Sequence, residues 1–190
     1  WPEETPYDTP EIAEARRVQR ERSATIHLPG REVMRQQWTN RLYGDGAERK
    51  DRRAVVVLGP PASGKTSNIV SRIVQRYGAI ILDPDLVKPW IPESEGGKYG
   101  GVVHDESSQV ATNAYTRAAR AGDNIVLPLV GKNTEKIKAF VESMREAGYT
   151  VDAYYIGVPI ETAAERAARR FSMGEQSFVD PAYVLSIGDT

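Results

Sequence analysis

The chain has 190 residues, of which 40% are hydrophobic and 27% charged, as expected for one globular α/β domain with a substantial core. A net charge of −1 gives no global attraction to nucleic acid or anionic lipid, so neither a nucleic acid nor a membrane is an expected partner. The lack of cysteine excludes disulfides and thiolate chemistry, and two histidines exclude a histidine-rich metal site. No apolar run is long enough to span a bilayer, and a cytoplasmic location is expected. Because the chain begins at Trp1 and not at Met, its natural ends are expected to lie elsewhere.

The first 50 residues predict two helices in front of the main domain. Residues 1–10 contain three prolines and are expected to be irregular. Helix-forming residues over 11–22 predict a thinly anchored surface helix, and a second helix is predicted over 32–42. Trp38 on this second helix is interpreted as a packing anchor. Residues 43–53 are polar and predict a linker.

The stretch from Ala54 to Thr66 reads AVVVLGPPASGKT and organises the rest of the chain. Its apolar, β-branched start is typical of a strand buried in a parallel sheet. The residues that follow match G-x-x-x-x-G-K-[ST] without a mismatch, and a helix is predicted over 67–77. The sequence therefore predicts a phosphate-binding loop between a strand and a helix. The motif alone does not distinguish a kinase from a GTPase or an ATPase.

The chemistry of phosphate binding explains each residue type in this loop. Glycines allow backbone N–H groups to approach the phosphates, and the prolines stiffen the loop. Lys65 is predicted to reach the β- and γ-phosphates as a catalytic residue, and the Thr66 hydroxyl to hold Mg²⁺, so ATP and Mg²⁺ are the expected cofactors. Together with Arg166, the predicted ATP-binding residues are Gly59, Pro60, Ala62, Ser63, Gly64, Lys65, Thr66 and Ser67.

Strands and helices alternate along the remainder of the chain. Strands are predicted over 79–82, 124–130 and 151–158, and helices over 105–121, 135–147 and 160–171, with one further turn near 181–185. Asp105 and Asn133 are the expected helix caps, and residues 89–101 predict a mobile loop. This order predicts a three-layer α/β fold of the P-loop NTPase and kinase type, with a mainly parallel central sheet and N-terminal helices. The expected division is an N-terminal helical extension, 1–50, and a P-loop domain, 51–190, for which kinase activity is implied only by a family resemblance.

Reactive groups in such sheets lie beyond the carboxyl ends of the strands. Asp85 follows the second strand and is predicted to act as the general base that accepts a proton from a hydroxyl. Asp83 is assigned to the substrate side, either near the metal or capping the loop. The alternative for both aspartates is an Asx-turn before a proline-rich loop.

Arginines and scattered cations supply the other candidates. Arg166 and Arg170 share one face of a predicted helix, and an arginine that reached the triphosphate would stabilise the transferred charge; the alternative is a solvated basic face. Lys88, His104 and Lys132 are the weaker substrate-binding candidates, and local spacing does not decide among their roles.

Four segments together resemble the zeta-toxin kinases: GPPASGKTS, AIILDPDLVK, VVH before a helix, and GYTVDAYYIGVP leading to a helix that ends in RRF. The resemblance extends from about Arg53 to Val184. It implies transfer of the ATP γ-phosphate to a hydroxyl of a nucleotide-linked sugar, UDP-N-acetylglucosamine or an NAD-like molecule. It also implies that Asp85 is the base, that Lys88 and His104 lie near the substrate, and that Arg170 contacts the phosphates.

The sequence departs from the family pattern in two places. Family members commonly carry a glutamate at the end of the third strand, where it holds the amino sugar, and here the segment reads Pro128-Leu129-Val130-Gly131-Lys132. A second arginine is usual downstream, yet no arginine follows Arg170, and Lys132 is a candidate replacement. Kinase activity is therefore the firmer expectation and the identity of the acceptor hydroxyl the weaker one.

Two alternatives to this kinase stay open at the level of sequence. One is a different P-loop kinase that acts on a metabolite, a nucleoside or a polynucleotide, and the other is an ATP-binding interaction module without catalysis. The resemblance further implies an antitoxin or inhibitor protein as a candidate partner, and delivery into a target cell as an alternative location. The N-terminal helices are interpreted as a domain extension, and the alternative is the remnant of a cover over the ATP site.

Overall fold

The computed structural model describes residues 4–26, 28–174 and 177–188, and the chain divides into two compact units. The sheet unit comprises residues 39–83 and 111–157, and the helical unit comprises residues 1–38, 84–110 and 158–190. The α-helices are α1 (Pro10–Thr25), α2 (Glu32–Tyr43), α3 (Ser71–Tyr77), α4 (Pro84–Val87), α5 (His104–Ala121), α6 (Thr134–Glu146), α7 (Ile160–Ser172) and α8 (Pro181–Leu185).

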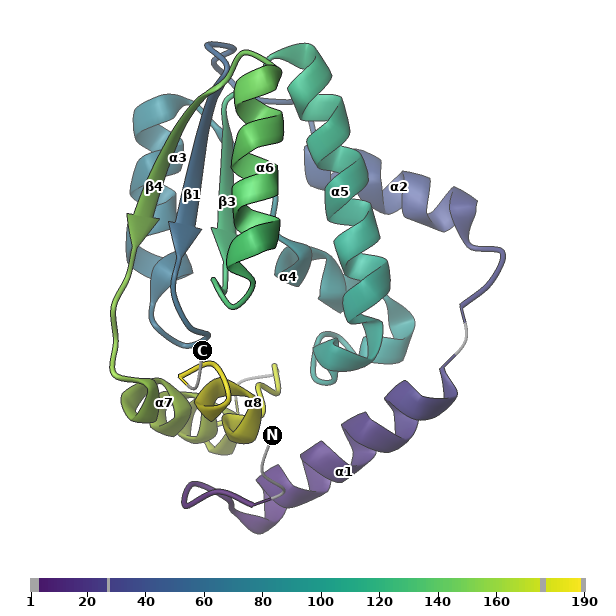
Figure 1. Cartoon of the computed structure of the whole chain (residues 1–190). Coiled ribbons are helices and arrows are strands. Elements are labelled where there is room, and N and C mark those ends of the chain that lie inside the picture. The colour runs from purple at the N-terminus through teal and green to yellow at the C-terminus, as the bar shows by residue number, and fades with distance from the viewer. Residues whose placement is uncertain (1–3, 27, 175–176, 189–190) are drawn as a thin grey trace. The chain divides into compact units, whose positions relative to one another are not determined.

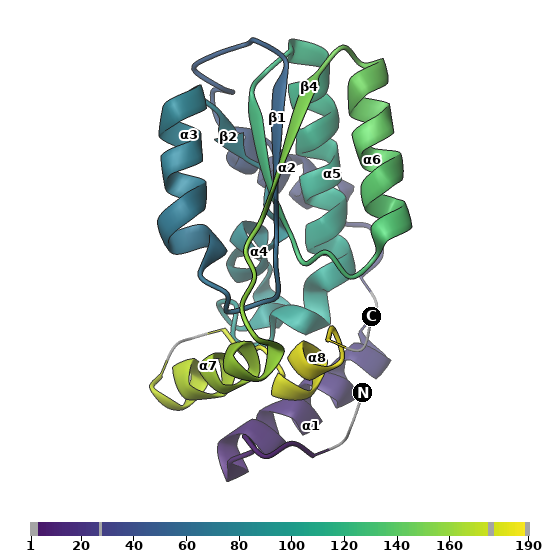
Figure 2. The same cartoon turned by 60° about the vertical axis from the view of Figure 1, so that its left-hand side comes forward.

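The sheet unit contains a four-stranded parallel sheet, which confirms the predicted parallel sheet. Figure 1 shows β4, β1 and β3 side by side, and Figure 2 also labels β2. The strand order is β2-β3-β1-β4, so β1 lies between β3 and β4. The strands are β1 (Arg53–Leu58), β2 (Ile80–Ile81), β3 (Ile125–Leu129) and β4 (Thr150–Tyr155).

Side chains of β1 alternate between the two faces of the sheet. Val55 packs with Val70 and Ile73 on one face, whereas Ala54 belongs to a cluster with Met144 of α6 on the other. A β-strand directs successive side chains to opposite faces, so a continuous apolar run is buried on both. Figure 2 shows α3 and α6 on opposite sides of the sheet. The three-layer arrangement predicted from the sequence is thereby confirmed.

A proline lies inside strand β3 without interrupting the sheet. Pro128 is paired in register with Val57 of β1. The backbone N–H groups of Ile80 and Leu82 donate to the carbonyl oxygens of Asn124 and Val126. The backbone N–H and C=O groups of the even-numbered residues of β3 therefore point toward β2. Strand β2 ends at Ile81, and the missing N–H of Pro128 therefore faces the side where no ladder bond is required.

The helical unit contains α1, α4, α7 and α8. Its longest C-terminal helix, α7, buries four alanines at the spacing of one helical face, namely Ala163, Ala164, Ala167 and Ala168. The predicted turn near 181–185 is confirmed as α8, whose N-terminus is capped by the Asp180 side chain.

Several local predictions were wrong in detail. Residues 89–101 were expected to form a mobile loop, and the structure shows short 3₁₀-helices at Lys88–Trp90, Pro92–Ser94 and Gly100–Val103. The buried Ser94 hydroxyl explains this order, because it lies 2.6 and 2.8 Å from the carbonyl oxygens of Lys88 and Ile91. The expected cap Asp105 lies inside the first turn of α5, which begins at His104, whereas the Asn133 cap of α6 is confirmed.

Within the described residues, no helix has both the length and the apolar character that crossing a membrane requires.

Candidate active site

The phosphate-binding loop begins where β1 ends, and its first glycine is held between two strands. The Gly59 N–H donates to the Leu129 carbonyl at 3.2 Å, and the neighbouring Ile156 N–H donates to Leu58. A Cβ atom at Gly59 would lie 2.7 Å from the Ile156 carbonyl oxygen, a distance that no real side chain tolerates. The close approach of two backbones therefore explains the first glycine of the motif.

The loop then adopts backbone conformations that glycine favours. Gly64 has a φ of +86° and precedes a π-helix, Lys65–Val70, which continues into α3. Ala62 also has a positive φ, +57°, which an L-residue adopts only under strain. Strained and π-helical backbone persists only where the surrounding structure holds it in place, and it is found most often at functional sites.

Two polar groups of the loop are poised for an anionic ligand. The Lys65 ammonium donates to the carbonyl oxygens of Gly59 and Pro60, the latter at 2.7 Å, so it lies over the loop. The Ser63 hydroxyl is buried and has no hydrogen-bond partner among the described residues. A phosphate chain would supply the acceptor that this hydroxyl lacks and the anion that Lys65 would neutralise, so the loop fits the phosphates of a nucleotide such as ATP.

The side chains of Thr66 and Ser67 lie outside the described residues, and their predicted contacts with Mg²⁺ and phosphate remain predictions. Across the described part of the chain, no group of three or more histidine, aspartate and glutamate side chains is arranged to hold a metal ion.

The other strand ends of the sheet unit bring two predicted substrate residues to the same edge of the sheet. Leu58 is paired with Leu129, so the loops after β1 and β3 start side by side. Asp83 follows β2 and is 7% exposed, whereas Lys132 follows β3 and is exposed. The sheet unit thus groups the phosphate loop with a buried carboxylate and an exposed ammonium.

The helical unit carries the predicted base. Asp85 lies in α4 with its side chain 73% exposed, and its carboxylate pairs with Lys88 Nζ at 2.6 Å. The Lys88 stem packs over Gly100, where a Cβ atom would be 2.8 Å from Lys88 Cδ. Two residues predicted separately from the sequence, the base and a substrate cation, are therefore one ion pair.

His104 and Tyr183 lie in the electrostatic field of this pair. Desolvation and then the positive charge of Lys88 lower the pKa of His104, which favours a neutral imidazole at neutral pH. Burial and then the Asp85 charge raise the pKa of Tyr183, so its phenol stays protonated. Sequence reasoning missed Tyr183 because its link to Asp85 spans 98 residues and no local motif marks it.

Two arginines of α7 lie at the exposed border of its buried alanine face. Arg166 and Arg170 are both exposed and are four residues apart, so they share a face as the sequence predicted. Their predicted roles toward the triphosphate stay predictions. The helical unit therefore holds Asp85, Lys88, His104, Arg166 and Arg170, while the sheet unit holds the phosphate loop, Asp83 and Lys132.

The phosphate-binding loop lies within a segment that matches the model of a known protein family. The family model described as Zeta toxin matches residues 37–184. The chain belongs to the zeta toxin family. A comparison with curated proteins gave no match. Membership makes the protein an ATP-dependent P-loop kinase of the toxin type, which confirms the predicted activity class.

Solved structures show the same fold at low sequence identity. One comes from the PezAT chromosomal toxin–antitoxin system of Streptococcus pneumoniae, with a TM-score of 0.65, 13% identity, and coverage of 85% of this chain and 71% of that one. Another is AvrRxo1-ORF1:AvrRxo1-ORF2 with sulphate ions, with a TM-score of 0.58, 20% identity, and coverage of 94% and 55%. The AvrRxo1-ORF1:-ORF2 structure with ATP has a TM-score of 0.55, 17% identity, and coverage of 95% and 59%. The zeta toxin chain described here thus spans little more than half of the AvrRxo1 chains.

Proposed function

We propose that the protein transfers the γ-phosphate of ATP to a hydroxyl of a nucleotide-linked sugar. The observation that carries the proposal is the phosphate loop, in which the Lys65 ammonium lies over the loop and the buried Ser63 hydroxyl lacks a partner among the described residues. The AvrRxo1 structure with ATP supports ATP as the phosphate donor. Nucleotide-linked sugars carry phosphates, and the cations Lys88, Lys132, Arg166 and Arg170 suit such an anionic acceptor.

Each candidate residue has a defined task in this reaction. Asp85 accepts the proton of the acceptor hydroxyl while its oxygen bonds to phosphorus and the bond to the leaving diphosphate breaks. Lys65 neutralises charge on the phosphates, and Arg170, with Arg166, stabilises the charge of the phosphoryl group in transfer. Thr66 would hold Mg²⁺, which offsets phosphate charge when bound. The neutral His104 would donate a hydrogen bond to the acceptor molecule, and Asp83 would help to orient the acceptor molecule.

Pro128 argues against an amino sugar as the acceptor. This residue occupies the end of β3, where zeta toxins commonly carry a glutamate, and a proline side chain cannot accept a hydrogen bond from an amino or amide group. Nucleotide-linked acceptors whose sugar ring carries only hydroxyl groups, such as the riboses of NAD-like molecules, therefore fit this chain better than UDP-N-acetylglucosamine.

The decisive experiment is transfer of labelled phosphate from ATP to a panel of UDP-sugars, NAD, free nucleosides and a 5′-hydroxyl oligonucleotide. Lys65→Met and Asp85→Asn should each reduce transfer by at least about 100-fold. Asp85→Asn should keep its ATP affinity, and the exposed Asp45→Asn is the matched control. Label on a nucleoside or an oligonucleotide alone would refute the acceptor class, and unchanged turnover of Asp85→Asn would remove Asp85 as the base.

A protein inhibitor is the partner that we propose for the whole protein. The PezAT neighbour comes from a toxin–antitoxin system, and the AvrRxo1-ORF1 structures contain a second protein. Co-purification with the product of an adjacent gene, and loss of transfer when that product is added, would test this assignment.

A further inference from the structure

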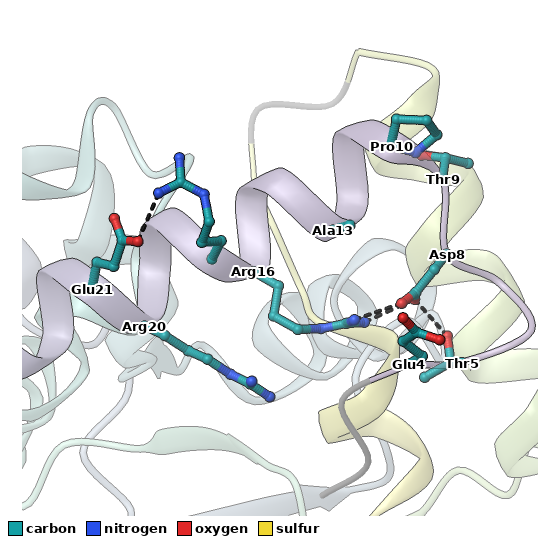
Figure 3. A pocket seen from close by; sticks show the side chains of 10 residues that line it. Glu4, Thr5, Asp8, Thr9, Pro10, Ala13, Arg16, Arg20 and Glu21 are labelled. Carbon is teal, nitrogen blue, oxygen red and sulfur yellow. Dashed lines mark hydrogen bonds and ion pairs between the residues drawn. The ribbon is translucent and has the colours of Figure 1, made fainter.

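A buried arginine in α1 joins two distant parts of the helical unit. Arg16 is 5% exposed, and its Nη1 and Nη2 donate to Asp8 at 2.5 and 2.8 Å (Figure 3). Its Nε lies 2.9 and 3.0 Å from the two carboxylate oxygens of Asp180, which is also 5% exposed. Asp180 in turn caps α8 by accepting from the Ala182 N–H at 2.9 Å. One guanidinium therefore connects the N-terminal segment to the start of α8.

The same face of α1 contacts the segment between the candidate substrate residues. The Gln19 side chain accepts from the Gly101 N–H at 3.3 Å, and a Cβ atom at Gly101 would collide with it. Arg22 pairs with Glu95 at 2.5 Å, and its guanidinium lies 4.7 Å from the centre of the Tyr99 ring. Positions 12, 15, 16, 19 and 22 are spaced as one helix face, so these contacts form a continuous stripe.

Both parts that α1 holds lead to candidate site residues. The 95–101 segment precedes His104, and its Gly100 supports the Lys88 stem. Helix α8 packs on α7, which carries Arg166 and Arg170, and the turn after α8 reaches the start of α7 where Gly188 meets Ile160. The Phe178 N–H donates to the Lys98 carbonyl at 2.8 Å and ties the two parts to each other.

We propose that residues 4–25 form a strap that sets the spacing between the arginine helix and the Lys88–His104 segment, with Arg16 as its positioning residue. The proposal rests on the proposed function for the roles of these side chains. Because misplacement of a reacting group by about 1 Å lowers rates by about 100-fold, a fixed spacing between two charged sets has direct kinetic consequences. A cover that leaves the protein would instead separate Arg16 from the buried Asp180 carboxylate, which disfavours that alternative.

The test compares Arg16→Met, Arg16→Lys and Asp180→Asn with the matched control Arg17→Met. The amide introduced by Asp180→Asn retains an oxygen that can cap α8, so this variant keeps the cap but removes the charge and one of the two acceptor oxygens that face Arg16 Nε. Arg17 is the neighbouring arginine, and its partners Glu14 and Glu21 lie on the exposed surface of α1 itself. Three quantities are measured in the full chain: amide hydrogen exchange, ATP affinity and transfer rate.

We expect Arg16→Met to accelerate exchange by about tenfold in both 95–104 and 160–185, and to lower kcat by about tenfold or more. ATP affinity should stay within about twofold, because the phosphate loop belongs to the sheet unit. Asp180→Asn should match Arg16→Met, the double variant should add nothing further, and Arg16→Lys should recover part of the rate. Arg17→Met should behave as the parent chain.

Three results would overturn the strap. One is faster exchange confined to α1, and another is a parallel loss of ATP affinity and of protection in β1 and β3, which indicates general destabilisation. A chain lacking residues 1–25 that turns over faster than the parent would establish a cover. Hydrogen exchange can be measured without an acceptor substrate, so it tests the strap independently of the proposed function. A chain that labels no nucleotide-linked sugar would refute the proposed function, and the exchange data would still confirm or refute the strap.

Discussion

The sheet unit and the helical unit of this kinase are each stabilised internally by a different kind of contact. In the sheet unit, Val55, Val56 and Ile125 are completely buried. The Arg49–Asp51 pair of this unit lies at the surface, and the buried Asp123 carboxylate pairs with the exposed Lys50 from a nearby loop. In the helical unit, buried charges bridge segments far apart in the chain, as the pairs Arg16–Asp180 and Arg35–Glu106 show. Apolar contact is non-directional, whereas a buried ion pair fixes the geometry of both partners.

This difference agrees with the tasks that we assign to the two units. A phosphate loop needs a rigid base, and a close-packed sheet provides one with little dependence on pH or salt. Asp85 and Lys88, which are proposed to meet the acceptor, lie on short helices, and they are oriented by directional contacts. The predictions that follow separate these two modes of stabilisation.

The largest effect is expected from the sheet unit. Ile125→Ala removes a completely buried side chain from the cluster on the α5 and α6 face, and should lower the free energy of unfolding by about 2–5 kcal/mol. Urea denaturation measures the loss, and Val33→Ala, at a residue 73% exposed, should change stability by less than about 0.5 kcal/mol. An equal loss of unfolding free energy in the two variants would show that burial of Ile125 does not stabilise the sheet unit.

The same contrast explains what the sequence could reveal. The β-branched run of β1 and the glycine spacing of the loop predicted the parallel sheet and the phosphate site, because both depend on local patterns. The pairing of Arg16 with Asp180 joins residues 164 positions apart, and no local pattern announces it. Tyr183 was missed for the same reason, and the order of residues 89–101 depends on Ser94, whose buried position the sequence does not reveal.

Removing one buried charge from the helical unit should have a smaller effect. Glu106 is 4% exposed and accepts from Arg35 at 3.1 Å, with Arg31 Nε at 3.6 Å. Glu106→Gln keeps the shape but loses the charge between two guanidinium groups, and should cost about 1–2 kcal/mol. Glu32→Gln is the control, because Glu32 pairs with the same Arg35 at 3.8 Å but is 76% exposed. We expect less than about 0.5 kcal/mol there, and a control as damaging as Glu106→Gln would contradict the role of burial.

Arg52 of the sheet unit combines a strained backbone conformation with directional hydrogen bonds from its side chain. Its φ is +54°, and its guanidinium donates to the carbonyls of Ala119 and Ala147, near the ends of α5 and α6. Arg52→Ala and Arg52→Gly lose the same hydrogen bonds, but only alanine keeps the left-handed strain. Thermal unfolding should therefore find the glycine variant more stable by about 0.5–1 kcal/mol. A more stable alanine variant would show that the backbone at residue 52 is not strained.

The smallest effect should appear only in acid. Hydrogen bonds from Arg16 lower the pKa of Asp8 below its ordinary value of 3.8. The folded pKa thus lies below the unfolded pKa, so the contribution of Asp8 is complete above the ordinary value and is lost as the pH falls through the folded value. Hydrogen exchange of α1 and α8 between about pH 6 and pH 3 should show a steeper loss of protection in the parent chain than in Asp8→Asn. Asp45→Asn should follow the parent, and β1 should lose little protection in any of them. Identical slopes for parent and Asp8→Asn would mean that Asp8 does not help to orient Arg16 and that Asp180 alone holds it in place.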